Sequence, residues 1–155
     1  MVNDESPLDD PALKTFGFLI EVSARLQRSL GQALEEGVSL PLGWLEVLLR
    51  LARSEGEQLA MGVLANQIVL TTGGVTRLID RMESAGYVER RPCPTDRRVL
   101  YAGITEAGKQ KMYEAARVHA EGLREAFEVF SVQDLDTLHR LLDRLHVATE
   151  GGKRS

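Results

Sequence analysis

Residues 64–108 constrain the fold more than any other part of the chain. They begin with a short helical pattern whose inward-facing residues are Leu64, Ala65 and Ile68. A polar turn follows, and apolar residues then recur with the period of one helix face, at Val75, Leu78, Ile79 and Met82. Gly86 suits the end of this second helix, because glycine readily adopts the left-handed backbone found beyond helix C-termini.

Two β-type runs complete this stretch. Residues 87–91 and 99–104 read YVERR and VLYAGI, and the residues between them include Pro92 and Pro94. Proline fits the tip of a hairpin better than a strand interior, because it has no backbone N–H for the strand ladder. A helix, a turn, a second helix and a hairpin in this order predict a winged helix-turn-helix.

Helices are also expected on the N-terminal side of this unit. Apolar spacings of three and four predict a long amphipathic helix over residues 12–36, with Gly37 as its end. Residues 42–52 are apolar nearly all round, which indicates a buried helix, and Pro41 suits its first turn. Residues 59–61 are compatible with a minor strand.

Two further helices are expected on the C-terminal side. Thr105 can cap a helix that runs to about Phe130, and Ser131 with Asp134 forms a capping-box pattern before a last leucine-striped helix. We therefore predict a mainly α chain with a small β wing (α+β), in the order α-α-(β)-α-α-β-β-α-α. Residues 1–11 and 150–155 are polar and are predicted to be disordered tails.

Composition narrows the class of protein. The chain has 43% hydrophobic and 27% charged residues, as in globular proteins, and no apolar run approaches the roughly 18–20 residues that span a bilayer. The N-terminus is acidic and lacks the basic and apolar regions of a signal peptide, so we expect a cytoplasmic protein without membrane contact. The single cysteine excludes an internal disulfide framework.

The charge is unevenly distributed. The formal net charge is −4, yet residues 71–111 carry eight Lys/Arg against five Asp/Glu, whereas both flanking segments are acidic. One surface of an acidic protein can therefore be positive, as a focused contact with DNA phosphates requires.

The start of the second helix of the central unit suits the DNA major groove. Thr71, Thr72 and Gly73 offer little bulk and a helix N-terminus with free N–H groups, which favours an anion. Thr76 and Arg77 lie off the apolar stripe and are predicted to reach base edges. Arg81, one turn later, is expected to contact a phosphate, or else to be an ordinary solvated arginine.

The hairpin tip is the second predicted contact. An arginine at such a tip can enter a minor groove, which is narrow and negative at A·T tracts. Asp96 lies two residues before Arg98, where a carboxylate would repel DNA unless it holds an arginine in place. Arg97 is grouped with this pair as a DNA-binding residue. The alternative is a surface salt bridge that contributes less than about 1 kcal/mol.

These motifs resemble the MarR family of bacterial transcriptional regulators. Residues 96–108 (DRRVLYAGITEAG) fit its wing pattern of Asp-x-Arg, an apolar strand and Thr-x-x-Gly. Residues 76–83 and 86–90 fit its recognition helix and the strand that follows, and Leu40-Pro41 also fits. The resemblance covers roughly residues 12–148.

The resemblance implies a homodimer that binds double-stranded DNA at a palindromic operator. Residues 12–36 and 109–149 would form the helical dimerisation region, and residues 38–108 the DNA-binding lobe. Leucine stripes without an intrachain partner of similar length agree with pairing by a two-fold axis. Arg98 would enter the minor groove. The resemblance also implies a small-molecule effector, expected to be aromatic or phenolic, which releases DNA by shifting the spacing of the two lobes.

Several residues have competing interpretations. Trp44 is expected to be a core residue, or to line an aromatic-ligand pocket with Phe16 and Phe18. Cys93 is an incidental thiol or a redox sensor. A metal-sensing site is the alternative interpretation of His119, His139 and His146. They are widely spaced and lack a companion set of carboxylates or cysteines, so we predict no metal site and no cofactor.

No enzyme motif is recognisable. The sequence lacks a phosphate-binding glycine loop, a nucleophile with a plausible base, and paired carboxylates on a site framework. The expected function is a dimeric repressor released from DNA by a ligand. The alternatives are a regulator that answers to no ligand and a winged helix that binds a protein instead of DNA.

Overall fold

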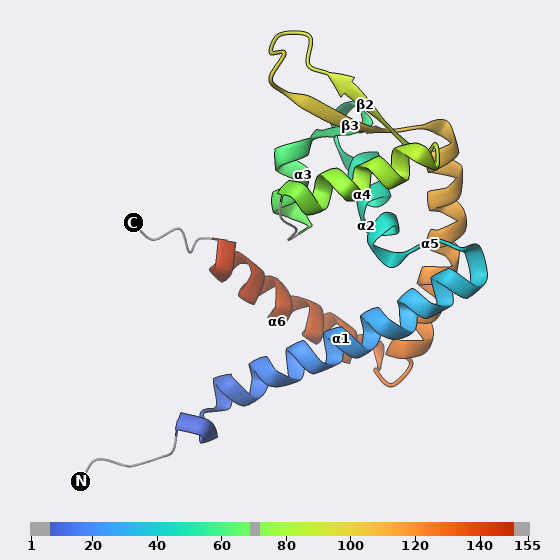
Figure 1. The fold of residues 1–155 in the computed structure, drawn as a ribbon. Helices are drawn as coiled ribbons and strands as arrows, with labels where there is room; N and C mark the ends of the chain where they lie inside the picture. The colour runs from blue at the N-terminus through green and yellow to red at the C-terminus, as the bar shows by residue number, and fades with distance from the viewer. Residues whose placement is uncertain (1–6, 69–71, 151–155) are drawn as a thin grey trace. The chain divides into compact units, whose positions relative to one another are not determined.

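The structure is a computed structural model that describes residues 7–68 and 72–150 of the chain. The chain divides into two compact units, residues 1–120 and 121–155. The predicted order of elements is confirmed (Figure 1): α1 (Pro11–Val38), α2 (Leu42–Arg53), β1 (Gln58–Ala60), α3 (Met61–Gln67), α4 (Thr72–Ser84), β2 (Val88–Pro92), β3 (Leu100–Ile104), α5 (Glu106–Phe127) and α6 (Val132–Glu150). In the described part of the chain, no helix has the length and apolar character needed to cross a membrane.

Helix α1 differs from its prediction at both ends. Asp10 caps its start, with the carboxylate accepting a 2.7 Å hydrogen bond from the Ala12 N–H. The prediction that Gly37 ends the helix is wrong, because α1 continues through Gly37, and Ser39 with φ of 50° closes it. The lack of a side chain at Gly37 serves packing instead, since a Cβ there would lie 3.4 Å from the methyl groups of Val118.

The tails are shorter than predicted where the structure describes them. The prediction of disorder is wrong for residues 7–11 and 150: residues 7–9 form a 3-10 turn, Asp10 and Pro11 begin α1, and Glu150 ends α6. Residues 1–6 and 151–155 lie outside the described residues.

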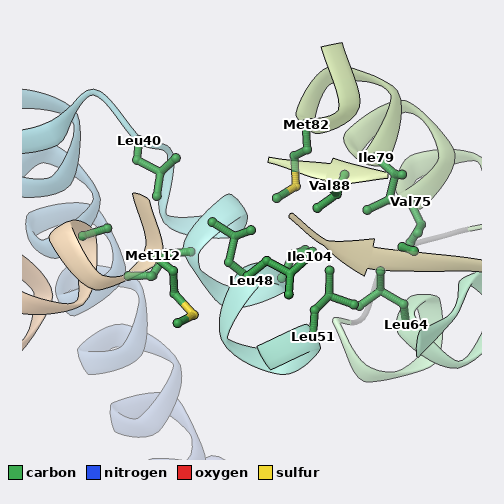
Figure 2. Close-up of a cluster of buried hydrophobic side chains, with 14 of the residues drawn as sticks. Leu40, Leu48, Leu51, Leu64, Val75, Ile79, Met82, Val88, Ile104 and Met112 are labelled. Atoms are coloured by element: carbon green, nitrogen blue, oxygen red, sulfur yellow. The ribbon is translucent and has the colours of Figure 1, made fainter. Parts of the chain in front are cut away.

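The core of the first unit is built around α2. Leu45, Leu48 and Leu51 on this helix are fully buried, as is Val47. They pack with the buried stripe of α4 and the inward residues of the sheet (Figure 2): Val75, Ile79, Met82, Val88, Ala102 and Ile104. Burial of each large aliphatic side chain contributes roughly 1.5–3 kcal/mol, so this cluster holds the helices and the sheet together as one body.

A three-stranded antiparallel sheet has the order β1-β3-β2. Gly103 of the central strand pairs with Gln58 of β1 on one side and with Glu89 of β2 on the other. Pro92 was predicted in the tip and is instead the last residue of β2. A proline is tolerated there because β2 is an edge strand.

The second unit contains the end of α5 and all of α6. Helix α5 ends at Phe127, three residues before the predicted end, and Phe130 lies in the turn that follows. The predicted capping box is confirmed: the Ser131 hydroxyl accepts from the Asp134 N–H at 3.2 Å, and Asp134 accepts from the Ser131 N–H at 3.1 Å. Hydrogen bonds from Ser131 lower the pKa of Asp134.

Candidate nucleic-acid interface

The outer face of α4 has the predicted arrangement. Gly73, Thr76 and Arg77 are exposed, while Val75 and Ile79 are buried. Thr72 is the first residue of the helix, and Thr71 lies outside the described residues. The helix therefore presents short polar side chains and one arginine near its N-terminal end, which is the part of a recognition helix that contacts bases.

Arg81 packs against an aromatic ring. Its guanidinium carbon lies 5.7 Å from the centroid of the Trp44 ring, within the range of a cation–π interaction. Trp44 in turn meets Tyr87 edge-on, with ring centroids 6.1 Å apart and an interplanar angle of 76°. Trp44 therefore belongs to the partly buried margin of the core, and Arg81 links α4 to α2.

At the wing tip, Asp96 holds Arg98 through both oxygens. Oδ1 accepts from the Arg98 backbone N–H at 3.0 Å and from Nε at 3.1 Å, and Oδ2 accepts from Nη2 at 3.1 Å. These bonds lower the pKa of Asp96. The Arg98 side chain is nevertheless 90% exposed. The carboxylate thus orients the guanidinium without covering it, and Arg97 beside it is also exposed.

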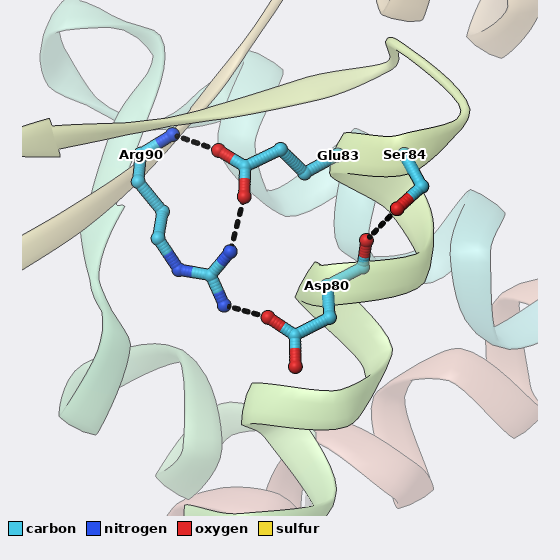
Figure 3. A network of polar contacts seen from close by, with 4 residues as sticks. All are labelled: Asp80, Glu83, Ser84 and Arg90. Carbon is cyan, nitrogen blue, oxygen red and sulfur yellow. Dashed lines mark hydrogen bonds and ion pairs between the residues drawn. The ribbon is translucent and has the colours of Figure 1, made fainter.

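An ion-pair network joins α4 to the wing (Figure 3). Arg90 on β2 donates from Nη2 to Asp80 at 2.5 Å and from Nη1 to Glu83, while its backbone N–H donates to Glu83 at 3.0 Å. The Arg90 side chain is 21% exposed. Burial would lower the pKa of Arg90, but the bonds and charges of Asp80 and Glu83 outweigh it and raise the pKa.

This network was not predicted from the sequence. Asp80 lies off the apolar stripe of α4 and is exposed. The available signal was the spacing of Asp80 and Glu83, which puts two carboxylates on neighbouring turns of one helix shortly before a strand that carries Arg90.

Arg91 spans the sheet. It donates from Nε to Glu89 at 2.8 Å and from Nη1 to Gln58 at 3.3 Å, so it reaches from β2 across β3 to β1. Gly103 makes this path possible, because a Cβ there would lie 2.6 Å from the Arg91 guanidinium carbon.

A compact joint connects the base of the wing to α5. The Thr105 hydroxyl donates to the Gly86 carbonyl at 2.6 Å and accepts from the Gly108 N–H at 3.0 Å. The Thr105 N–H donates to the Tyr87 carbonyl at 3.1 Å. That carbonyl lies so close to Gly108 that a Cβ there would be 2.1 Å from the oxygen. The threonine of the Thr-x-x-Gly motif therefore supplies hydrogen bonds to this joint, and the glycine leaves room for the Tyr87 carbonyl.

The positive surface is smaller than the charge count suggested. Among the described residues, four of the eight cations in residues 71–111 form ion pairs away from the wing tip: Arg90, Arg91, Lys109 and Lys111. The exposed arginines that remain lie on α4 and at the wing tip. The positive charge is thus concentrated at the two predicted DNA contacts.

An open cleft of about 730 Å³ lies among α1, α2 and the end of α3. Its lining residues are mostly polar: Ala24, Gln27, Arg28, Leu42, Gly43, Glu46, Arg50, Gln67 and Ile68. The predicted pocket residues Phe16, Phe18 and Trp44 are not among them, and Phe16 and Phe18 are exposed on α1. The structure therefore does not bring these three aromatics together around this cleft.

Cys93 lies at the base of the wing tip. Its Sγ is 3.3 Å from the Thr95 hydroxyl, and this contact is the main cause of a lowered thiol pKa. Among residues 7–68 and 72–150, no three His, Cys, Asp or Glu side chains gather as a metal-binding group.

Known proteins resemble the chain in sequence and in fold. The MarR family profile matches residues 37–99. The HTH-type transcriptional regulator MhqR of Bacillus subtilis is 30% identical over 98 residues, which cover 63% of this chain and 67% of that protein. AbsC, a MarR family transcriptional regulator from Streptomyces coelicolor, has a TM-score of 0.80 at 28% identity, with 92% of this chain and 97% of AbsC covered. Sco3205, a MarR family regulator of the same organism solved in complex with DNA, has a TM-score of 0.78 at 25% identity, over 91% and 90% of the two chains.

Proposed function

The chain belongs to the MarR family of transcriptional regulators, and we propose that it acts as a homodimeric repressor that a small molecule releases from a palindromic operator. Like its relatives, it is a transcriptional regulator and not an enzyme. The repressor role, the pairing and the effector are the parts that we propose.

The observation that carries the proposal is the exposed Arg98 held by Asp96 at the wing tip. The bidentate contact fixes the direction of the guanidinium, while its 90% exposure leaves it accessible to DNA. A preoriented arginine loses less conformational freedom when it enters a minor groove. In this proposal Arg97 contacts the adjacent backbone.

The major-groove contact is assigned to α4. Thr71, Thr72 and Gly73 would approach the phosphates, and Thr76 and Arg77 would reach the bases. The exposure of Gly73, Thr76 and Arg77 supports this assignment. Arg81 would contact a phosphate with the face of its guanidinium that Trp44 does not cover.

Dimerisation is assigned to residues 12–36 and 109–149, and DNA binding to residues 38–108. Both end helices carry large exposed apolar side chains in the single chain. On α1 they include Leu13, Phe16, Phe18, Leu19 and Ile20, and on α6 they include Leu141, Leu142, Leu145 and Val147. Patches of this kind mark protein contacts, and a two-fold partner would cover them.

The effector would act by favouring one spacing of the two DNA-binding lobes. The predicted aromatic site of Phe16, Phe18 and Trp44 remains a prediction. The cleft among α1, α2 and α3 is a second candidate, since its volume of about 730 Å³ suits a small molecule and it lies beside α3.

The test begins with selection of binding sites by the full-length protein from a library of random-sequence duplexes. We expect a palindromic site, and we expect Arg98→Ala to weaken binding to it by roughly 1–3 kcal/mol. Arg91→Met is the matched control, because the Arg91 guanidinium is hydrogen-bonded to Glu89 and Gln58. Failure of the wild-type protein to enrich any sequence would favour a protein-interaction module.

The effector is tested with the same duplex. A panel of phenolic acids and metabolites is added to the complex at fixed protein concentration. Release of DNA by one of them supports ligand control, whereas no release by any would favour a regulator that answers to no ligand.

A further inference from the structure

Apart from the buried core, few contacts fix the position of the wing relative to α4. Only the turn of residues 85–87 separates α4 from β2. Beyond the short pairing with β1, the wing is a two-stranded ribbon, and such ribbons are marginally stable alone. Within the described residues, the outer edge of β2 has no strand neighbour, because the sheet order is β1-β3-β2.

Arg90 fills that outer edge. Its backbone N–H points away from β3 and donates to the Glu83 carboxylate of α4, which takes the place of the carbonyl that a neighbouring strand would offer. Its guanidinium then bridges Glu83 and Asp80, one turn apart on α4 (Figure 3). One residue thus joins the wing to the recognition helix through three hydrogen bonds, with two partners on the helix.

We propose that Arg90 is a positioning residue that fixes the wing to α4, so that Arg98 and the exposed face of α4 reach DNA at a constant separation. This inference rests on the proposed DNA contacts. When two DNA contacts are rigidly linked, formation of one raises the effective concentration of the other at its own site on the DNA. A looser link lowers that effective concentration and weakens the binding.

The neighbouring arginine shows why this role belongs to Arg90. Arg91 carries the same charge on the same strand, but it points across the sheet to Glu89 and Gln58, and none of its hydrogen bonds among the described side chains reaches α4. The two arginines therefore form a matched pair in which one ties the wing to the recognition helix and the other ties strands to each other.

The experiment is a double-mutant cycle on the DNA duplex selected by the full-length protein. In the wild-type background we expect Arg98→Ala to weaken binding by about 5- to 150-fold. In an Arg90→Met background, we expect the same substitution to cost less than about twofold. The penalty then falls by at least about 2.5-fold, which exceeds the roughly 1.7- to 2.3-fold within which independent sites add. In an Arg91→Met background the full Arg98 penalty should remain. Equal penalties in all three backgrounds would overturn the inference while leaving the proposed DNA contact intact.

Loss of charge balance is the competing explanation, because Arg90→Met leaves two carboxylates on α4 beside the DNA. The variant with Asp80→Asn, Glu83→Gln and Arg90→Met removes all three charges. We expect the Arg98 penalty to remain small in it, because the mechanical tie is still absent. Recovery of the full penalty would assign the effect to charge and would overturn the positioning role.

Footprinting gives an independent measurement that a loss of stability does not mimic. We expect Arg90→Met to retain protection of guanine N7 in the major groove and to lose hydroxyl-radical protection in the flanking minor groove. Equal loss of both would overturn the inference. If Arg90→Met does not fold, Asp80→Ala with Glu83→Met removes the acceptors of the same three hydrogen bonds and is read in the same way. A wild-type protein without an Arg98 penalty would overturn the proposed function and this inference together.

Discussion

Gly108→Ala is the sharpest test of the joint between the wing and α5. Alanine normally stabilises a helix interior relative to glycine by about 1 kcal/mol. At this position its Cβ would lie 2.1 Å from the Tyr87 carbonyl oxygen and 3.0 Å from Ile104 Cγ1. Favourable nonbonded contacts need roughly 3.5 Å, so either the carbonyl or the helix must move by more than 1 Å.

That movement also strains the hydrogen bonds of the joint. The Tyr87 carbonyl accepts from the Thr105 N–H at 3.1 Å, and the Thr105 hydroxyl donates to Gly86 at 2.6 Å. Overpacking costs about 1–3 kcal/mol and a weakened hydrogen bond about 1 kcal/mol. After the helix-propensity gain, the net loss in the free energy of unfolding is roughly 1–3 kcal/mol.

Thermal unfolding at a fixed protein concentration measures this loss. For a chain of this length we expect the Tm of Gly108→Ala to fall by roughly 3–10 °C. Gly62→Ala is the control, because Gly62 is exposed on α3 and a Cβ there would meet nothing within 4 Å. The control should not lower the Tm. A Gly108→Ala protein as stable as the wild type would refute the close approach of Tyr87.

Two further predictions concern the DNA-facing side chains. Asp96→Asn removes a negative charge next to DNA but is expected to weaken binding, because Arg98 loses its bidentate partner; stronger binding in a gel-shift titration would contradict this. Arg98 lowers the pKa of Asp96, so the ion pair is fully present above the unfolded pKa near 3.9 and is lost only as pH falls through the lower folded value. The loss of DNA affinity in Asp96→Asn should therefore be constant from about pH 6 to 8. Arg81→Met should change the fluorescence of Trp44, the only tryptophan, and lower stability by under about 1 kcal/mol, whereas Arg77→Met should leave the emission unchanged.

The periodicity of the sequence predicted the order of the elements because local spacing determines which faces are apolar. The stripe of α4 is found where the spacing puts it. Helix α2 was predicted to be buried nearly all round, but it exposes Gly43, Glu46 and Arg50. The other errors fall at the ends of elements. Gly37 has two possible uses, as a helix end or as a place of close packing, and only the proximity of Val118 decides between them.

The candidate DNA contacts were predictable to the extent that their geometry is local. Asp96 and Arg98 are two residues apart, so a turn alone can bring them together, and the structure confirms the pair. Partners that are distant in the sequence could not be predicted in this way. The contact of Arg81 with Trp44 needs α2 and α4 to pack first, and the bond from Arg91 to Gln58 needs the strand order.

The two Arg-Arg dipeptides, at residues 90–91 and 97–98, show that residue type alone does not identify a DNA contact. Residues 89–91 read Glu-Arg-Arg and residues 96–98 read Asp-Arg-Arg, so a charge count treats them alike. Arg90 is 21% exposed between two carboxylates, whereas Arg98 is 90% exposed beside one. A cation whose charge is already matched on all sides adds little to the attraction of a phosphate, while one that is oriented but open to solvent retains its attraction. The same residue type is thus structural on the strand and available for DNA at the tip, and the arrangement of carboxylates around each guanidinium makes the difference.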